Sequence, residues 1–485
     1  MVEYAKDCEL VIGLASPVGV NHDDVESRLK DIFGQFNYHV NYIHLSELVF
    51  KHFNRRPPEN VSEIERLDWA MQTGTELRNK YSRGDLYALM AMDEINLERV
   101  SENKTVLPRN RTVHVIRSLK HAEEVNTLRQ VYGQGFFLLG VSASTESKKH
   151  YLRELKGVES ESELDRLIQR DDKESDKLGQ QTRNVFQLAD AFVTTDDNFR
   201  LSKQIGRIVD LIFSHPYQPP TEEEYAMFMA YAASLRSADL SRQVGAVLTN
   251  KMGDIVSTGA NDVPKFGGGL YWPGEDDCRD YVRKCDSNEM QRNDIMEDVI
   301  KSIVGKSVSE EEFEEYKLKL SKTRIGDLTE FGRAVHAEMD ALLQASRNGI
   351  SIRDAKLYTT TFPCHNCAKH IVVAGTKEVI YIEPYPKSFA TTLHDDSINN
   401  SENPVANKVN FRQFVGIGPR KFIDLFSMNL GNGRKVKRKE KGSIVSWSRS
   451  TAELRIPMSP LSYLESETDN VNLFASLVMK GGRNE

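Results

Sequence analysis

The sequence predicts an α/β protein in two successive parts, each built around a sheet with helices packed against it. In the first part, apolar segments that fit strands alternate with helical segments between residues 8 and 198, an order typical of a parallel sheet. In the second part, residues 242–264 contain two short alternating strands, and residues 355–375 contain a buried strand followed by a helix. A chain of 485 residues has room for two or three domains.

Composition and charge place the chain among ordinary water-soluble proteins. The net charge is −7, with 39% hydrophobic and 28% charged residues, so no overall positive charge favours a polynucleotide. One basic run, RKVKRKEK at 434–441, is predicted as a solvated loop or hairpin, with contact to phosphates or RNA as the alternative. There are five cysteines, no segment that resembles a signal peptide and no run that could span a bilayer, so we expect the reducing cytoplasm and no membrane partner.

Residues 8–33 read as an apolar strand, a glycine turn and an amphipathic helix. This is the layout in which backbone N–H groups hold a phosphate, and it makes Gly13, Ser16 and Gly19 the candidate nucleotide-binding residues. The loop departs from the Walker A pattern, because five residues separate the glycines instead of four and Val20 stands where a lysine would reach the terminal phosphates. We therefore expect no phosphate transfer here.

Further strands and helices follow in the first part. Residues 111–141 read as strand, helix and strand, and residues 189–198 as another strand with a polar end. In this order the segments resemble, over residues 8–214, the nucleotide-kinase branch of the P-loop fold. The resemblance implies a P-loop domain over residues 1–216 with a nucleotide-sensing or substrate-holding role. A degenerate scaffold that supports oligomerisation is the alternative, since fold does not imply function.

The second domain is predicted to begin at residue 217. Two prolines at 219–220 precede Thr221, and Glu224 follows three residues later, which is the capping-box pattern of a helix start. The strands within 242–264 turn at Gly253 and form a hairpin that ends at Asn261.

A pair of motifs carries the chemistry of the second domain. His336 and Glu338 are followed by Cys364 and Cys367, in the His-x-Glu and Pro-Cys-x-x-Cys arrangement of a zinc deaminase. One imidazole and two thiolates supply three ligands for Zn²⁺, and an open fourth position distinguishes a catalytic zinc site from a structural one. Glu338 would then move protons as a general acid and base. A structural zinc knuckle or a redox pair is the alternative for the two cysteines.

The secondary structure predicted around these motifs is consistent with three metal ligands and a separate proton-transferring carboxylate. Residues 355–362 form a strand that stops at Pro363, and residues 364–375 form a helix on which the two cysteines, three positions apart, share one face. The positive end of the helix dipole favours their thiolate forms. His336 and Glu338 open a second helix over 334–349 that Gly349 ends.

Four segments resemble the deoxycytidylate deaminase branch of the zinc deaminases: SLRSADLSRQVGAVLTN, TGANDVP, HAEMDALLQASRNG and TTTFPCHNCAKHIVVAGTKEVIYIEPYPKS. They span most of 225–390, and the domain they imply is an αβα cytidine-deaminase-like domain over 217–450. The resemblance implies that His336, Cys364 and Cys367 bind zinc, that Glu338 is catalytic, that Asn261 faces the sugar or base, that Arg242 pairs with phosphate and that Tyr385 stacks on the base. For Arg242, Asn261 and Tyr385, a surface, a turn and a packing role are the respective alternatives.

With the P-loop-like domain in front, the chain resembles the bacterial anti-phage deoxycytidylate deaminases. This implies a hydrolase that converts dCTP, dCMP or both to the uracil nucleotide and depletes nucleotides in antiviral defence. It also implies a homo-oligomer, a nucleotide effector and a small inhibitory RNA. Two other classes stay open: a deaminase that edits polynucleotides, which needs a positively charged channel, and a zinc-stabilised nucleotide sensor without turnover.

The remaining segments are less informative. Residues 265–335 form an insertion with a charged helical segment, and its Cys278 and Cys285 lack an obvious partner for a second, structural zinc. Residues 409–428 read as helix-like and mildly basic, and residues 451–485 as a C-terminal tail without a predicted structure.

Overall fold

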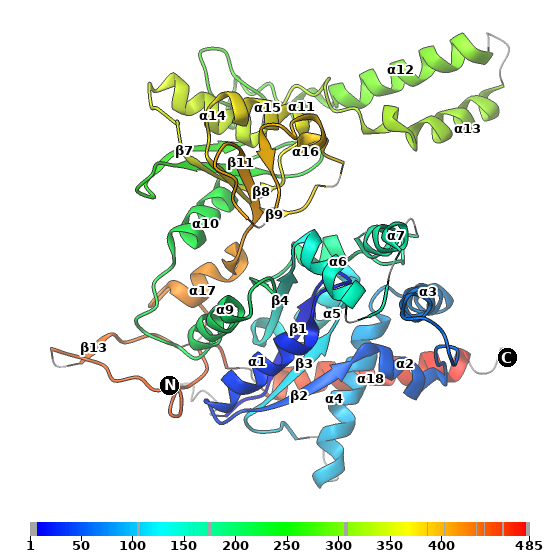
Figure 1. The fold of residues 1–485 in the computed structure, drawn as a ribbon, viewed down its shortest axis with the longest axis vertical. Helices are drawn as coiled ribbons and strands as arrows, with labels where there is room; N and C mark the ends of the chain where they lie inside the picture. Colours follow the sequence, from blue (N-terminus) through cyan, green and yellow to red (C-terminus); the bar gives the residue numbers. More distant parts are fainter. Residues whose placement is uncertain are drawn as a thin grey trace. The chain divides into compact units, whose positions relative to one another are not determined.

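The computed structural model of the chain divides into two compact units, which we describe separately (Figure 1). Unit 1 comprises Met1–Glu224 and Phe414–Glu485, and unit 2 comprises Tyr225–Gln413. The structure describes residues 7–481 except 104–106, 155, 159, 173, 175, 305–308, 386, 402, 433, 441 and 458–459. Within those residues, no helix is both long and apolar enough to cross a membrane.

Unit 1 is built on a six-stranded sheet whose five main strands are parallel. The strands lie in the order β12 (Gly416–Ile417), β5 (Ala191–Thr194), β4 (Phe136–Ser142), β1 (Leu10–Ala15), β3 (Thr112–Arg117) and β2 (His39–His44). All residues of β1 and β4 are buried, as expected of strands covered on both faces. The predicted strands and helices of residues 8–33, 111–141 and 189–198 are confirmed.

Helices surround this sheet. They are α1 (His22–Gly34), α2 (Leu45–Phe53), α3 (Glu63–Tyr81), α4 (Leu86–Asn103), α5 (Ala122–Tyr132), α6 (Thr145–Glu154), α7 (Glu161–Asp172), α8 (Thr182–Phe186), α9 (Asn198–Ile212), α17 (Phe422–Phe426) and α18 (Pro460–Gly481), with short 3₁₀ turns at Gly133–Gly135 and Pro419–Lys421. Helices α1 and α9 bury their apolar faces, including Leu29, Phe33 and Ile205, in one core with β1 and β3. This burial fixes the loop between β1 and α1 at the carboxyl end of the sheet.

The C-terminal segments differ from the expectation. Residues 409–428 contain two strands, β11 (Val409–Gln413) and β12, and only then the short helix α17. The helix-like interpretation of 409–428 is therefore wrong for its first half, because the alternation that buries Val409 and Phe411 suits a strand. The basic run at 434–441 lies at a small antiparallel pair, β13 (Lys439–Glu440) with β14 (Ser443–Ile444), where the predicted solvated hairpin is observed.

The segment expected as a tail forms α18, which packs against α4 in unit 1. Its Glu467 is fully buried and forms an ion pair with the guanidinium of Arg99. The same guanidinium lies 2.9 Å from the carboxylate of Glu9, the residue before β1. Tyr132 and Tyr463 donate hydrogen bonds to Glu467 and Glu9 respectively. Residues of α18 therefore belong to the core of unit 1, and the division into units differs from the predicted boundaries at 450 and 451.

We predict that Arg99→Met strongly destabilises unit 1. The change removes the cation that Glu9 and Glu467 share and leaves two buried carboxylates without it, a loss of about 3–5 kcal/mol in the free energy of unfolding. Chemical denaturation followed by circular dichroism measures it. Asp469→Ala, an exposed position on the same helix, is the matched control and should change stability little. An unchanged denaturation midpoint for Arg99→Met would show that this buried ion pair does not hold α18 in the core of unit 1.

Unit 2 contains a second six-stranded sheet of mixed direction. Its order is β10 (Ile398–Asn399), β11, β9 (Glu378–Glu383), β8 (Lys356–Thr361), β6 (Gly245–Thr249) and β7 (Ile255–Ala260). Strands β6 and β7 form the predicted antiparallel hairpin, whereas β8 to β11 run parallel. Together with unit 1, this confirms the α/β class with parallel sheets.

The helices of unit 2 are α10 (Glu222–Ser234), whose first three residues still belong to unit 1, α11 (Asp280–Arg283), α12 (Ser287–Val304), α13 (Glu310–Ser321), α14 (Ala337–Arg347), α15 (His365–Val373) and α16 (Ala390–Leu393), with a 3₁₀ turn at Arg324–Asp327. At the start of α10, Thr221 and Glu224 form the predicted reciprocal cap. Helices α12 and α13 lie side by side and project from the sheet as an arm made by the insertion (Figure 1). Helices α14 and α15 instead share one core with the sheet and carry the candidate site.

Candidate functional site

Three side chains meet at the facing ends of α14 and α15. His336 Nδ1 lies 3.2 Å from Cys364 Sγ and 3.3 Å from Cys367 Sγ, and one ligand atom from each residue falls within 4.8 Å of the others. His336 is the residue before α14, and Cys364 is the N-cap of α15 with Cys367 one turn later. The predicted i, i+3 spacing thus directs both sulfurs to one point.

The donor set fits a zinc ion. One imidazole nitrogen and two thiolates are the ligands that Zn²⁺ takes in catalytic sites, with a fourth position left for water or substrate. Within the part of the chain that the structure describes, this is the only cluster of three such donors, and no fourth histidine or cysteine joins it. A closed structural site is therefore disfavoured.

The three ligands share their protons when no metal is bound. A hydrogen bond from Cys367 lowers the pKa of Cys364 to about 4, and the hydrogen bond to Cys364 raises the pKa of His336 to about 9. Burial raises the pKa of Cys367. Metal binding requires two thiolates and a neutral imidazole, so loading the site releases protons.

Glu338 stands beside this cluster. It lies on the first turn of α14, is 4% exposed, and its Oε2 is 3.4 Å from Cys367 Sγ. Burial raises the pKa of its carboxyl group, which is the shift that suits a side chain able both to take and to give a proton. The four residues that the motifs singled out are thus brought together in one place.

A cavity of about 180 Å³ opens next to the cluster. His336, Glu338 and Cys364 line it, and so do the predicted Arg242, Asn261 and Tyr385. The guanidinium of Arg242 lies 5.1 Å from the centre of the Tyr385 ring, and its Nη1 is 3.5 Å from Glu383 Oε1. Arg242 remains 45% exposed, so its charge is available to an anion that enters.

Asn261 has both ends of its side chain engaged by backbone. Its Nδ2 donates to the carbonyl of Arg242 at 2.8 Å, and its Oδ1 accepts from the amide of Val244 at 2.6 Å. These bonds fix the chain entering β6, so Asn261 positions Arg242. A direct contact of Asn261 with substrate stays a prediction.

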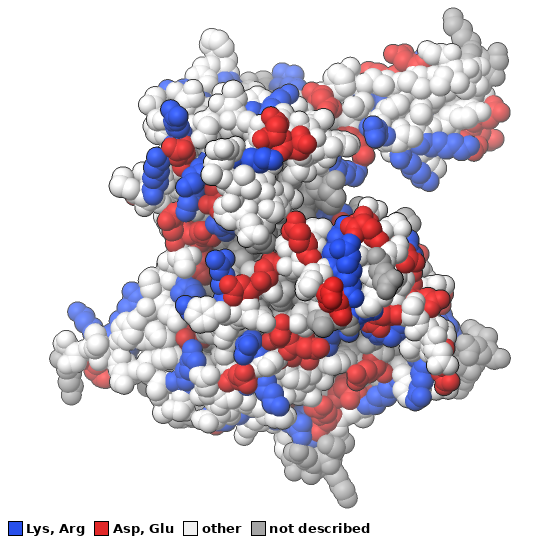
Figure 2. Space-filling view, in the orientation of Figure 1, with Lys and Arg blue, Asp and Glu red and all other residues white. Residues whose placement is uncertain are grey.

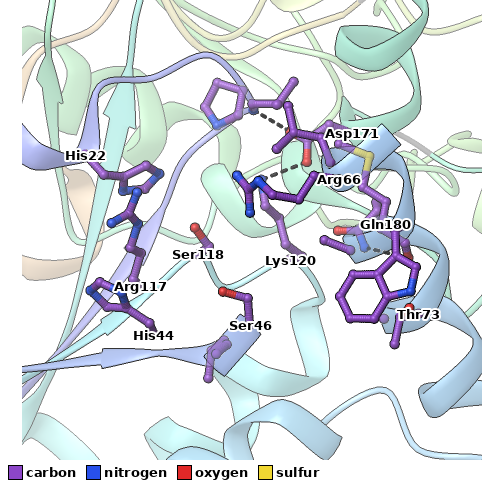
Figure 3. A pocket seen from close by; sticks show the side chains of 18 of the residues that line it. His22, His44, Ser46, Arg66, Thr73, Arg117, Ser118, Lys120, Asp171 and Gln180 are labelled. Atoms are coloured by element: carbon purple, nitrogen blue, oxygen red, sulfur yellow. Dashed lines mark hydrogen bonds and ion pairs between the residues drawn. The ribbon is translucent and has the colours of Figure 1, made fainter. Parts of the chain in front are cut away.

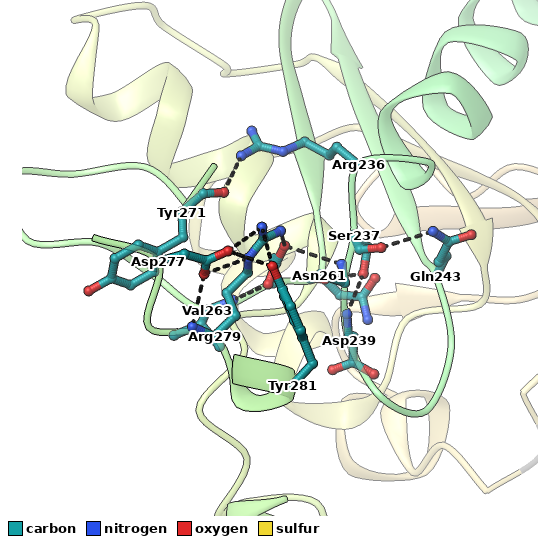
Figure 4. A network of polar contacts seen from close by, with 12 residues as sticks. Arg236, Ser237, Asp239, Gln243, Asn261, Val263, Tyr271, Asp277, Arg279 and Tyr281 are labelled. Carbon is teal, nitrogen blue, oxygen red and sulfur yellow. Dashed lines mark hydrogen bonds and ion pairs between the residues drawn. The ribbon is translucent and has the colours of Figure 1, made fainter. Parts of the chain in front are cut away.

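Sequence reasoning missed a buried ionic network behind this wall (Figure 4). Arg279, in the insertion, donates to Asp277 and, at 3.2 Å, to Asp262, the residue after Asn261. Tyr281 also donates to Asp277, at 2.7 Å. No local pattern signals this network, because its partners come from the end of β7 and from the insertion.

A second arginine of the insertion, Arg333, lines the cavity. Its Nη1 donates to Asp280 Oδ1 at 2.6 Å and to the carbonyl of Cys278 at 3.1 Å. The insertion therefore forms part of the site wall. Cys278 itself joins no cluster of metal donors among the described residues, and Cys285 Sγ lies 2.8 Å from Met290 Sδ.

In unit 1, each of the three residues predicted to bind nucleotide has a different structural setting. Gly13 is inside β1, where a Cβ would lie 2.6 Å from Leu119, so close packing explains the glycine. Ser16 Oγ is 2.9 Å from His22 Nε2, and Gly19 adopts a φ of +88° in the loop before α1. Nucleotide binding by these three residues stays a prediction.

Comparison with known proteins identifies relatives of unit 2. The family model of the cytidine and deoxycytidylate deaminase zinc-binding region matches residues 220–383. Deoxycytidylate deaminase of Enterobacteria phage T4 is 33% identical over 160 residues, which cover 33% of this chain and 77% of that protein. The phage T2 enzyme of the same name is 31% identical over 191 residues, 39% of this chain and 95% of that protein.

Among solved structures, the dCMP deaminase of cyanophage S-TIM5 in complex with dCMP and dUMP matches with a TM-score of 0.24 and 19% identity. The match covers 41% of this chain and all of that chain. The zinc-binding region that matches in sequence contains His336, Cys364 and Cys367. The family match and the donor set together identify the cofactor as Zn²⁺.

Proposed function

The chain belongs to the cytidine and deoxycytidylate deaminase family, and from this premise we propose that it hydrolyses the exocyclic amine of free deoxycytidine nucleotides, dCMP, dCTP or both. The observation that carries the proposal is Glu338, a buried carboxylate in contact with the His336, Cys364 and Cys367 cluster at the cavity wall. The products would be the uracil nucleotide and ammonia.

The roles of the residues follow from where they lie. Zinc held by His336, Cys364 and Cys367 would supply Lewis-acid chemistry and lower the pKa of a water molecule from about 15.7 toward 7. Glu338 accepts a proton from the attacking water and donates one to the ring nitrogen. Glu338 then takes the remaining proton of the water oxygen, which is now bonded to the ring carbon, and delivers it to the amine. The bond between the ring carbon and the amine breaks, ammonia leaves, and that oxygen becomes the carbonyl oxygen of the uracil product.

A free nucleotide suits this cavity better than a polynucleotide. Arg242 and Arg333 line the cavity, and they supply the cations that a phosphate chain would meet. On the face that Figure 2 shows, lysines and arginines are interspersed with acidic residues. A channel for single strands needs a positively charged groove instead.

The experiment that tests the proposal measures product formation from dCMP, dCTP, CMP, CTP and a single-stranded oligonucleotide by zinc-loaded protein. Uracil product from a free deoxynucleotide, absent in the Glu338→Ala variant, supports the proposal and gives the phosphate preference. Product from the oligonucleotide alone would replace it with polynucleotide editing. Nucleotide binding without turnover on any substrate would favour the sensor.

For Arg242 we predict a loss of substrate affinity. Arg242→Ala should raise KM for the preferred nucleotide by about tenfold and change kcat less, because it removes a charge-assisted contact made equally in the ground and transition states. Steady-state kinetics measure both constants. Lys251→Ala, an exposed lysine that pairs with Asp354 outside the cavity, is the control. A normal KM in Arg242→Ala would leave Arg242 as a surface residue.

Unit 1 we propose to be a P-loop-type nucleotide-binding domain without phosphotransfer, which sets when unit 2 works. The central position of β1, followed by a loop and the N-terminus of α1, supports this. By resemblance we also propose a cytoplasmic homo-oligomer that depletes nucleotides during phage infection and is held inactive by a small RNA. Expression in infected cells with Glu338→Ala as control, and copurification of RNA with the purified chain, test these roles.

A further inference from the structure

A second cavity, of about 390 Å³, lies within unit 1 (Figure 3). It opens at the carboxyl ends of the parallel strands β1, β2 and β3, and the loop before α1 and the helices α2, α3 and α7 contribute to its walls. In open parallel sheets, ligands bind in the crevice at these strand ends. The volume falls in the range of small-molecule sites.

In the loop between β1 and α1, a carboxylate of the protein itself occupies the place where such loops bind an anion. The amide of Val18 donates to Asp171 Oδ2 at 2.8 Å, and the ammonium of Lys120 contacts Asp171 Oδ1 at 2.7 Å. Lys120 also donates to the carbonyl of Ser16, at 2.6 Å. Asp171 is 1% exposed. A backbone amide of the loop and a lysine thus hold an internal carboxylate in the way that such loops hold a phosphate.

Two buried side chains that line the same cavity have polar atoms without a partner among the described residues. They are Nδ1 of His22, which is 8% exposed, and Nε and Nη1 of Arg78, which is 3% exposed. Among the described residues, the Arg78 guanidinium donates one hydrogen bond, from Nη2 to Glu124 at 2.7 Å, and lies 4.8 Å from the centre of the Tyr87 ring. Burying polar groups without partners is costly, so these atoms favour a ligand with hydrogen-bonding groups.

The rest of the lining suits a charged ligand with a flat ring. Arg66, Arg117 and Lys156 bring further positive charge, and Glu47 and Glu63 are the acidic residues there besides Asp171. Figure 3 shows Arg117 on one side of this space, with Arg66 and Lys120, which overlap in this view, across from it. Trp69 and apolar residues such as Leu67 and Met71 form another part of the wall. Aromatic faces stack on planar rings, and arginines pair with phosphate.

We propose that this cavity binds a nucleoside phosphate, and that its phosphate group replaces the Asp171 carboxylate on the Val18 amide and the Lys120 ammonium. The inference rests on the proposed nucleotide-binding role of unit 1 and is independent of deamination. Asp171 lies in the last turn of α7, so binding displaces the end of that helix from the loop. The carboxylate keeps the loop ordered when no ligand is bound.

The test is a titration of the full-length protein with nucleoside mono- and triphosphates, the matching nucleosides and inorganic phosphate, followed by calorimetry and tryptophan fluorescence. We expect binding of a nucleoside phosphate, weaker binding of its nucleoside, and a fluorescence change that Trp69→Phe abolishes. Binding that Arg242→Ala removes and Lys120→Met leaves intact would place the nucleotide in the cavity of unit 2 and overturn the proposal.

Two charge variants sharpen the test. Asp171→Asn keeps an acceptor for the Val18 amide but removes the competing charge, so affinity should rise by about tenfold, the factor that one charge-assisted hydrogen bond contributes. Lys120→Met should lower affinity by at least the same factor, and Lys120→Arg should restore most of it. Asp172→Asn is the matched control, since its carboxylate pairs with Arg183 and does not line the cavity.

The results that would overturn the proposal are distinct from a failure of the deaminase. Circular dichroism establishes that each variant is folded before binding is measured. No binding of any nucleoside phosphate at millimolar concentration to either wild type or Asp171→Asn would contradict the proposal. Equal affinities of wild type, Asp171→Asn and Lys120→Met would do so as well, whatever the rate of uracil formation.

Discussion

Replacing Glu338 by alanine or glutamine should abolish turnover while the protein retains its zinc. The carboxylate is buried against the metal-binding cluster and is the proton carrier of the proposed reaction, and general acid and base catalysis contributes about 10²–10⁴-fold to rate. Glutamine keeps the size and removes the proton transfer, so a loss of this order in both variants separates chemistry from packing. Product formation under saturating nucleotide and elemental analysis of the same preparations measure the two quantities.

The matched control is Asp340→Asn, two residues further along α14. Asp340 is also a buried carboxylate, but it accepts a hydrogen bond from the amide of Ala260 at 3.2 Å, which an asparagine can still accept. Its variant should therefore keep most of the activity. A Glu338→Gln enzyme with a normal rate would refute the assignment of Glu338 as the proton carrier.

Replacing Cys364 should instead remove the metal and, with it, the activity. Cys364→Ala takes away one of the three ligands that meet within 4.8 Å. The loss of zinc affinity should exceed the roughly 10–100-fold that loss of an outer-shell partner costs. Elemental analysis after dialysis measures zinc per chain. The thermal unfolding midpoint should also fall, since bound metal stabilises the folded state by mass action.

Cys278→Ala is the control for Cys364→Ala, because Cys278 belongs to no cluster of metal donors among the described residues. It should keep both zinc and activity. Full zinc content in Cys364→Ala, or zinc loss in Cys278→Ala, would show that the metal is held elsewhere in the chain.

Much of the zinc centre could be predicted from local spacing. Residues three apart at the start of a helix share a face, so Cys364 and Cys367 were expected to converge. The helix that follows His336 was predicted from its Ala, Leu and Met content and from Gly349 at its end. Continuous apolar segments in the sequence likewise indicate strands that are buried in a sheet. Strands β1, β4 and β8 are therefore found in the segments where they were expected.

The sequence by itself determined the class of fold, the helices and strands that carry the metal ligands, and the chemistry of the donor set, because these depend on neighbours within about one helical turn or one strand. Only the tertiary structure decided which distant groups meet. Arg279 joins Asp262, Glu467 enters the core of unit 1 beside Arg99, and Asp171 occupies the loop before α1. Each of these contacts joins a charged side chain to a group that is distant in the chain, and its contribution to stability depends on burial, which arises only once the elements have packed.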